Sequence, residues 1–141
     1  MTASAAGRRP QVGVVVFCWR DGQFLMQRRA RGFGAGCWSV PGGAQEHGET
    51  FEEAGIREVR EETSLVVSGL ALTAVTNDMA MPLGGEHWIT VWLDARHVTG
   101  EPVISEECAE YRWATMGDLP APLFQPHWDN LFSYMARRSA R

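Results

Sequence analysis

The fold is decided by residues 43–65, which read GAQEHGETFEEAGIREVREETSL. Thr50 and Glu53 have the spacing of a helix capping box, in which each side chain binds the backbone N–H of the other residue. The pattern predicts a helix that starts at Thr50 and runs to about Thr63. We expect this helix to carry the chemistry of the protein, because its glutamates gather on one face.

Three glutamates of the predicted helix form that face. Glu58 and Glu62 are one turn apart, and Glu61 lies three residues from Glu58. Like charges at this spacing cost a helix a few tenths of a kcal/mol per pair, which indicates a compensating cation. Carboxylate oxygens suit Mg²⁺, or Mn²⁺ in its place. The alternative is that the glutamates are only the solvated face of a surface helix, and the helix alone does not separate the two interpretations.

Small residues lie one turn before Glu58 on the same face. They are Ala54 and Gly55, and a glycine inside a helix costs about 1 kcal/mol relative to alanine. Their size would let another piece of backbone approach. A turn predicted at residues 41–43 is the candidate, since a glycine backbone can bring a carbonyl toward a metal ion. Gly42 is therefore a predicted metal ligand.

Length and composition predict one domain. The chain has 141 residues, 45% of them hydrophobic, which is enough for one core and too little for two ordinary domains. Residues 1–10 are small and polar and lack the apolar core of a signal peptide, so we expect a flexible tail before a domain at 11–141. The longest apolar run, residues 12–19, is too short to cross a bilayer. A cytoplasmic protein without a membrane partner is the expectation.

Cysteine count and charge exclude further classes. The three cysteines are odd in number and widely separated, so the sequence contains neither a disulfide framework nor a C-x-x-C zinc site. The net charge of −4 argues against a nucleic-acid polymer as partner, because binding one requires a basic face. Any phosphates would have to be held by a few arginines and bound cations.

Glycines and prolines divide the rest of the chain into short elements. Asp21-Gly22 has the residue types of a tight hairpin turn between two strands. The predicted elements are strands at 12–19 and 23–28, a glycine-rich loop at 32–36, β-rich segments at 65–76 and 87–94, and a last helix at 127–138. Strands mixed with two helices predict an α/β fold with the sheet between the helices.

The spacing of the residues around the acidic face matches a known motif. Gly43, Glu49, Arg57-Glu58-Val59, Glu61-Glu62 and Leu65 reproduce the Nudix box, G-x5-E-x7-R-E-U-x-E-E-x-G-U with U aliphatic. Six identities at these offsets arise by chance on the order of once in ten million windows. The chain is therefore similar to the Nudix hydrolase family. Ser64 stands where the family has glycine, at a position that shapes the end of the helix.

The resemblance covers nearly the whole chain after Pro10. Segments 24–43, 75–77, 87–88, 105–113 and 119–124 resemble the subgroup that contains plant cytosolic Nudix hydrolase 1 and the human diphosphatase of thiopurine triphosphates. In several relatives a histidine and a leucine follow the double glycine, whereas this chain has Ala44 and Gln45. The difference lies beside the expected substrate pocket.

The resemblance implies a Nudix α/β/α sandwich around a mixed sheet. It also implies Mg²⁺-dependent hydrolysis of nucleoside triphosphates (NTP or dNTP, modified forms included) to the monophosphate and pyrophosphate. One alternative is another diphosphate substrate: a nucleotide sugar, a dinucleoside polyphosphate or a prenyl diphosphate. A second is a catalytically silent nucleotide-binding domain, which retention of the box glutamates disfavours. The implied partner is a small nucleotide, and a homodimer stays open.

The resemblance also implies site roles. The implied metal ligands are Glu58, Glu61, Glu62, Glu106 and Gly42, with Glu107 as the alternative to Glu106. Glu61 is otherwise the base that activates water, and the implied catalytic group is Glu61, Arg57 and Glu58. Arg57 would orient a box glutamate, and Glu49 would support the same cluster. Metal ions would neutralise the polyphosphate and lower the pKa of the attacking water.

Substrate-binding candidates come from outside the helix. They are Arg28, with Arg29 as its alternative, as a phosphate clamp, Gln45, Asn77 and His87 beside the base, and Phe124 as a stacking ring. Trp88 is either core or pocket. Because few of these side chains are placed to bind the edge of a base, we expect discrimination within about 100-fold across common dNTPs.

Overall fold

The computed structural model describes residues 9–32, 34–79 and 86–139. Most of the predicted tail lies outside these residues, and the two described members, Arg9 and Pro10, are exposed. The elements in chain order are β1 (Gln11–Arg20), β2 (Gln23–Arg29), β3 (Trp38–Ser39), β4 (Gly42–Ala44), α1 (Phe51–Thr63), β5 (Val66–Met79), β6 (His87–Thr99), β7 (Cys108–Ala114) and α2 (Gln125–Ser139).

The strands form a mixed sheet in the order β3-β2-β1-β6-β5. β1 runs parallel to β6, and β5 is antiparallel to β6 over almost its whole length. On its other edge β1 has two partners: its first half pairs with β4 at Gly13–Val15, and its end pairs with β2 at Trp19 and Arg20. The sheet therefore splits beside β1, and this split opens a route from one face to the other.

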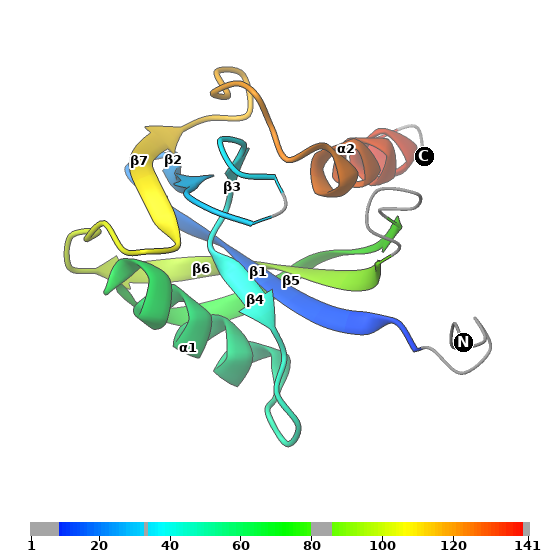
Figure 1. Ribbon diagram of the computed structural model, residues 1–141, viewed down its shortest axis with the longest axis horizontal. Helices are drawn as coiled ribbons and strands as arrows, with labels where there is room; N and C mark the ends of the chain where they lie inside the picture. Colours follow the sequence, from blue (N-terminus) through cyan, green and yellow to red (C-terminus); the bar gives the residue numbers. More distant parts are fainter. Residues whose placement is uncertain (1–8, 33, 80–85, 140–141) are drawn as a thin grey trace.

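The two helices cover opposite faces of the long strands (Figure 1). On one face, α1 packs Ala54 and Val59 into a core cluster with Val14 and Val16 of β1. On the other, α2 packs Trp128 and Leu131 against alternate residues of the same strands, which include Val15, Phe17 and Trp92. This is the expected α/β/α sandwich. Over the described residues, neither helix has the length and apolar character needed to span a membrane.

Helix α1 begins and ends as its sequence predicts. Thr50 accepts a hydrogen bond from the Glu53 amide, and the Glu53 side chain accepts one from the Thr50 amide, which completes the capping box. At the other end Ser64 adopts φ 68°, the left-handed conformation usual for glycine, and its amide donates to Arg60 O. Ser64 thus keeps the geometry of the glycine it replaces.

The predicted hairpin between β1 and β2 is confirmed. Asp21 and Gly22 both have positive φ, 51° and 77°, as a two-residue turn of this kind requires. Strand β7, in contrast, was not predicted. It pairs with β2 across about eighty residues of sequence, and its partly exposed pattern gives little local signal.

The turn predicted at residues 41–43 is wrong, because Gly42–Ala44 forms strand β4. A Cβ at Gly42 would lie 2.3 Å from Val14 O, so only glycine lets β4 approach β1 this closely. The predicted partner of Gly55 is also wrong. A Cβ there would meet Val16 and Leu70 at 3.0 Å, so Gly55 lets the helix settle on the sheet and does not face Gly42.

Candidate active site

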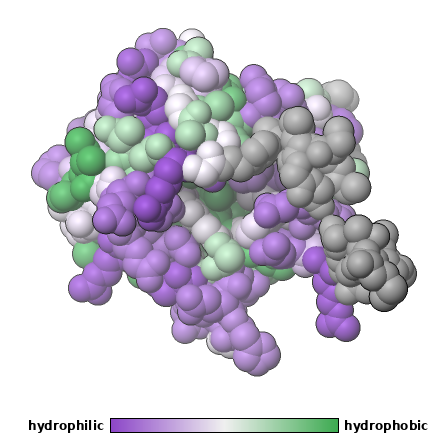
Figure 2. All heavy atoms as spheres, viewed as in Figure 1, coloured by the Kyte–Doolittle hydropathy of each residue, from purple (hydrophilic) through white to green (hydrophobic). Residues whose placement is uncertain are grey.

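A cavity of about 590 Å³ lies where the sheet splits. We call one part of it the carboxylate end, formed by Glu58, Glu61, Glu62 and Glu107. The other part is the β5/β6 end, formed by Asp78, Trp88, Thr90 and His127. Residues of β1 and β2 line the space between them. In Figure 2 hydrophilic residues cover the lower part of the visible face, where α1 lies.

Glu62 occupies the most buried position of the carboxylate end. Its Oε2 accepts hydrogen bonds from the Gly42 amide at 2.9 Å and from Gln27 Nε2 at 3.2 Å. Burial, opposed by these two donors and reinforced by the nearby Glu58 carboxylate, raises the pKa of Glu62 to about 7. Among the described residues no cationic side chain is hydrogen-bonded to Glu62. Its negative charge is therefore costly in the metal-free protein.

Glu58 lies next to Glu62 on the same face and packs against the backbone of β4. A Cβ at Gly43 would lie 2.5 Å from the Glu58 carboxyl carbon, so the box glycine makes room for this carboxylate. Burial raises the pKa of Glu58, although Arg57 Nη1 donates to Oε1 at 2.8 Å and acts in the opposite direction. The two carboxylates thus share a partly buried position that favours neutralisation.

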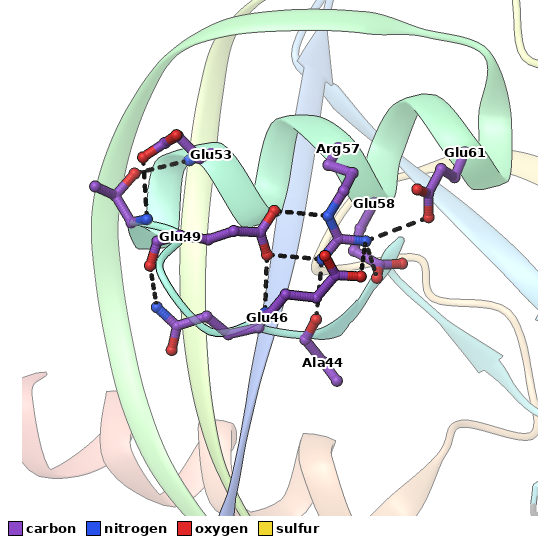
Figure 3. Close-up of polar contacts among 9 residues, drawn as sticks. Ala44, Glu46, Glu49, Glu53, Arg57, Glu58 and Glu61 are labelled. Atoms are coloured by element: carbon purple, nitrogen blue, oxygen red, sulfur yellow. Dashed lines mark hydrogen bonds and ion pairs between the residues drawn. The ribbon is translucent and has the colours of Figure 1, made fainter.

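Arg57 organises the outer part of the acidic face (Figure 3). Its Nε and Nη2 donate to both oxygens of Glu49 at 2.7 and 2.8 Å, and Nη2 also donates to Ala44 O. Nη1 reaches Glu58 at 2.8 Å and Glu61 at 3.3 Å. The bidentate contact with Arg57, followed by the Glu46 amide, lowers the pKa of Glu49 to about 2. Arg57 therefore connects β4, the loop between β4 and α1, and helix α1 itself.

The donor chemistry of the carboxylate end fits a divalent cation. Within residues 9–32, 34–79 and 86–139, no three acidic, histidine or cysteine side chains converge as a complete metal-ligand set. Mg²⁺ does not require one, since it typically takes one or two carboxylates together with waters and substrate phosphates. Glu58 and Glu62, with raised pKa values and hard oxygen donors, meet that requirement.

Other predicted ligands lie as follows. Gly42 contributes its amide to Glu62, and the role of its carbonyl stays a prediction. Glu106 does not line the cavity; its side chain is 88% exposed and lies 3.6 Å from Arg31. Glu107 lines the cavity and binds Arg31 at 2.8 Å. The structure therefore favours the alternative glutamate for this role.

Arg28, one of the two arginines predicted to clamp a phosphate, does not line the cavity. Successive residues of a strand point to opposite faces, and Arg28 turns away to pair with Glu110 of β7. Arg29 lines the cavity, with its guanidinium 4.6 Å from the centre of the Phe124 ring. Arg31 also lines it. Arg29 and Arg31 are therefore the arginines positioned for a phosphate.

Three predicted pocket residues do not line the cavity. Gln45 donates to Glu49 O within the loop before α1. Asn77 and His87 contact each other on the opposite face of β5 and β6. Their sequence neighbours Asp78 and Trp88, which are directly paired across the strands, line the cavity instead. A shift of one residue along a strand exchanges its faces, which accounts for these errors.

Phe124 lines the cavity as expected, and it also belongs to the core cluster beneath α2. Core packing of this ring is therefore confirmed, and its stacking on a substrate stays a prediction. Trp88 lines the cavity and donates its indole N–H to Glu86. Sequence reasoning missed Gln27, Asp78, Thr90 and His127, which all line the cavity. Alternation from Trp88 would have found Thr90, but nothing local marked the other three.

Comparisons with known proteins agree on the family. A family model described as NUDIX domain matches residues 7–134. The chain is 30% identical over 115 residues to the ADP-ribose pyrophosphatase of Methanocaldococcus jannaschii, a match that covers 82% of this chain and 68% of that protein. It is 35% identical over 116 residues to the "Putative 8-oxo-dGTP diphosphatase 3" of Mycobacterium tuberculosis, covering 76% of this chain and 52% of that protein.

Solved structures include a similar fold at comparable identity. The crystal structure of a MutT NUDIX hydrolase from Burkholderia pseudomallei superposes with a TM-score of 0.81 and 31% sequence identity. The match covers 89% of this chain and 98% of that one. The likeness therefore extends well beyond residues 43–65, over most of the chain.

Proposed function

This chain belongs to the NUDIX domain family and is a hydrolase of phosphorus anhydrides with a diphosphate-containing substrate, and from that premise we propose that it hydrolyses nucleoside triphosphates to the monophosphate and pyrophosphate. The proposed cofactor is Mg²⁺, with Mn²⁺ as a substitute. One observation carries the proposal: a single cavity joins a pair of partly buried carboxylates with raised pKa values to an end lined by aromatic rings. Phosphates suit the first end and a base the second.

The residues have distinct roles in this reaction. Glu58 and Glu62 would hold the metal ion, which neutralises the phosphates and lowers the pKa of the attacking water. Glu61 suits the general base. Its side chain is 59% exposed, which makes it the most accessible of the three helix glutamates, and its contact with Arg57, at 3.3 Å, is longer than the Arg57–Glu58 contact. Water attacks an inner phosphorus, the bond from that phosphorus to the α–β bridging oxygen breaks, and the nucleoside monophosphate and pyrophosphate separate.

The cavity arginines support the same assignment. Arg29, at the end of β2, and Arg31, two residues later, both line the cavity, and Arg31 binds Glu107 of the carboxylate end at 2.8 Å. Their guanidinium groups present paired N–H donors that match phosphate oxygens. The resemblance of segments outside the box to plant cytosolic Nudix hydrolase 1 and the human thiopurine-triphosphate diphosphatase is consistent with a triphosphate substrate.

Product analysis tests the proposal. The protein is incubated with each NTP and dNTP and Mg²⁺, and an early time point is separated by chromatography. We expect nucleoside monophosphate and pyrophosphate as primary products. Nucleoside diphosphate with orthophosphate would contradict attack at an inner phosphorus.

A second candidate substrate follows from one relative. The archaeal protein that is 30% identical to this chain is named an ADP-ribose pyrophosphatase. The same carboxylate end would accept its diphosphate. ADP-ribose therefore belongs in the panel, and AMP with ribose 5-phosphate as the fastest product would favour it over the triphosphates.

A further inference from the structure

A buried carboxylate at the β5/β6 end has no part in the proposed hydrolysis. Asp78 is 2% exposed and lines the cavity. Its Oδ2 accepts hydrogen bonds from the Thr76 and Thr90 hydroxyls, and its Oδ1 accepts one from Asn130 Nδ2 at 2.6 Å. His127 Nε2 lies 3.9 Å from Oδ2. Charged residues are seldom buried without a paired charge, so this carboxylate needs an explanation.

The position of Asp78 places it opposite the metal-binding residues. Gly43 of β4, Val14 of β1, Val91 of β6 and Val75 of β5 stand in register across the sheet. In this row three strand spacings, roughly 14 Å, separate β4 from β5, and Asp78 lies three residues farther along β5 than Val75. A nucleotide whose phosphates lie at Glu58 and Glu62 would therefore extend its base toward β5 and β6.

We propose that Asp78, with Thr90 and His127, binds the edge of the substrate base and selects bases that carry an exocyclic amino group, namely adenine, cytosine and guanine. Thymine and uracil are disfavoured. The proposal rests on the proposed function, because it assumes that the cavity holds a nucleotide.

The hydrogen bonds explain this preference. Two hydroxyls occupy the lone pairs of Oδ2, whereas Oδ1 has one donor and can accept another. Thr90 already donates to Asp78, so toward the cavity its oxygen acts as an acceptor. Asp78 Oδ1 and the Thr90 hydroxyl oxygen are thus two acceptors, which match the two N–H groups of an exocyclic amino group. Thymine and uracil instead flank their single N–H with two carbonyls, whose oxygens would face the carboxylate.

His127 adds a second polar group to this edge. Burial lowers the pKa of His127, against the opposing effect of Asp78, so a neutral imidazole faces the cavity at neutral pH. A neutral imidazole either donates or accepts through a ring nitrogen, according to its tautomer. It can therefore pair with the ring nitrogen next to the amino group in each of the three bases.

A purely structural role for Asp78 is the competing explanation, and the chain offers a matched control. Asp94 on β6 is likewise hydrogen-bonded, since it accepts from Thr73 Oγ1 at 2.7 Å and from Trp19 Nε1 at 2.8 Å. Asp94 is partly buried and does not line the cavity. Asp78→Asn and Asp94→Asn therefore both remove the charge of a hydrogen-bonded aspartate on β5 or β6, but only the first changes the cavity.

The test measures kcat/KM for dATP, dCTP, dGTP and dTTP with Mg²⁺. For the unchanged protein we expect dTTP to fall at least about 100-fold below the best substrate, a stronger discrimination than the sequence predicts, because a site built from buried hydrogen-bonding groups rejects a mismatched edge strongly. Asp78→Asn should reduce this gap to less than about 10-fold, since its amide N–H donates to a thymine carbonyl. Asp94→Asn should leave the ratio unchanged.

Equal use of the four dNTPs by the unchanged protein, or an unchanged ratio in Asp78→Asn, would overturn the proposal. If Asp78→Asn does not fold, His127→Leu replaces it, with an expected loss of about 10-fold for the best substrate and no loss for dTTP. If no triphosphate is hydrolysed, the proposed function fails. Calorimetric titration with dAMP, dCMP, dGMP and dTMP then still measures base selection, with weaker dTMP binding expected.

Discussion

Glu49 and Glu62 are both glutamates of the same motif, and their environments are opposite. Glu49 binds both arms of the Arg57 guanidinium, and its pKa falls to about 2. Among the described residues, Glu62 accepts only an amide N–H from the backbone and one from Gln27, and burial raises its pKa to about 7. Arg57 therefore balances the charge of Glu49, whereas no described cationic side chain is hydrogen-bonded to Glu62. The difference separates a carboxylate that holds the loop and helix together from the one proposed to bind a metal ion.

The largest expected effect is on turnover. Glu62→Gln and Glu58→Gln should each lower kcat at least about 100-fold, or roughly 2.7 kcal/mol of barrier, because the metal loses a charged ligand. Glu49→Gln should lower kcat by only about 10-fold, since it disturbs Arg57 and leaves both metal ligands in place. Steady-state kinetics at several Mg²⁺ concentrations measures this. Near-normal activity of Glu62→Gln at low Mg²⁺ would show that Glu62, like Glu49, is not a metal ligand.

The next effect is on stability without metal. A carboxyl whose folded pKa is raised from 4.5 to about 7 destabilises the folded state above pH 7, and the penalty disappears as the pH falls through 7 toward 4.5. In EDTA at pH 8, Glu62→Gln should therefore be more stable than the unchanged protein, by on the order of 2 kcal/mol. At pH 4.5 the difference should vanish.

Denaturant unfolding at the two pH values measures this effect, and Glu49→Gln is the control. Its lowered pKa means that the ionised form stabilises the fold above about pH 4.5, and that this contribution is lost as the pH falls toward 2. Glu49→Gln should therefore be less stable at pH 8. If Glu62→Gln and Glu49→Gln shift the free energy of unfolding in the same direction at pH 8, the opposite environments of the two glutamates are contradicted.

A smaller effect is expected at the end of the same helix. Ser64 has φ 68°, which is strained for a residue with a Cβ and relaxed for glycine. Ser64→Gly should raise the free energy of unfolding by about 0.5 to 1 kcal/mol, with kcat unchanged. The backbone strain at Ser64 would then lower stability without serving catalysis, whereas the buried charge of Glu62 lowers stability and is proposed to serve catalysis. Thermal unfolding with parallel kinetics measures both, and a fall in kcat would link the helix end to the metal site.

The smallest effect is expected at Glu106. Its exposed carboxylate lies outside the cavity, and exposed charges contribute little. Glu106→Gln should change kcat/KM by less than about 2-fold, whereas Glu107→Gln should lower it more. A larger loss of kcat/KM for Glu106→Gln than for Glu107→Gln in the same assay would make Glu106 the metal ligand instead.

The sequence by itself determined the local features. The capping box at Thr50, the hairpin turn at Asp21-Gly22 and the acidic face of α1 each depend on residues within a few positions of one another. For these features backbone preference and helical periodicity act directly, so sequence patterns identify them. The box also identified Glu58 and Glu62 as neighbours, because both lie on one helix.

Only the tertiary structure decided which strand residues line the cavity. Whether Arg28 or Arg29, and Asn77 or Asp78, faces inward depends on which side of the sheet each helix covers, and a strand pattern does not record this. The pairing of β4 with β1 likewise joins segments about thirty residues apart. Long-range packing selects one face of an alternating strand, and the selected face brings Asp78 into the same cavity as Glu62.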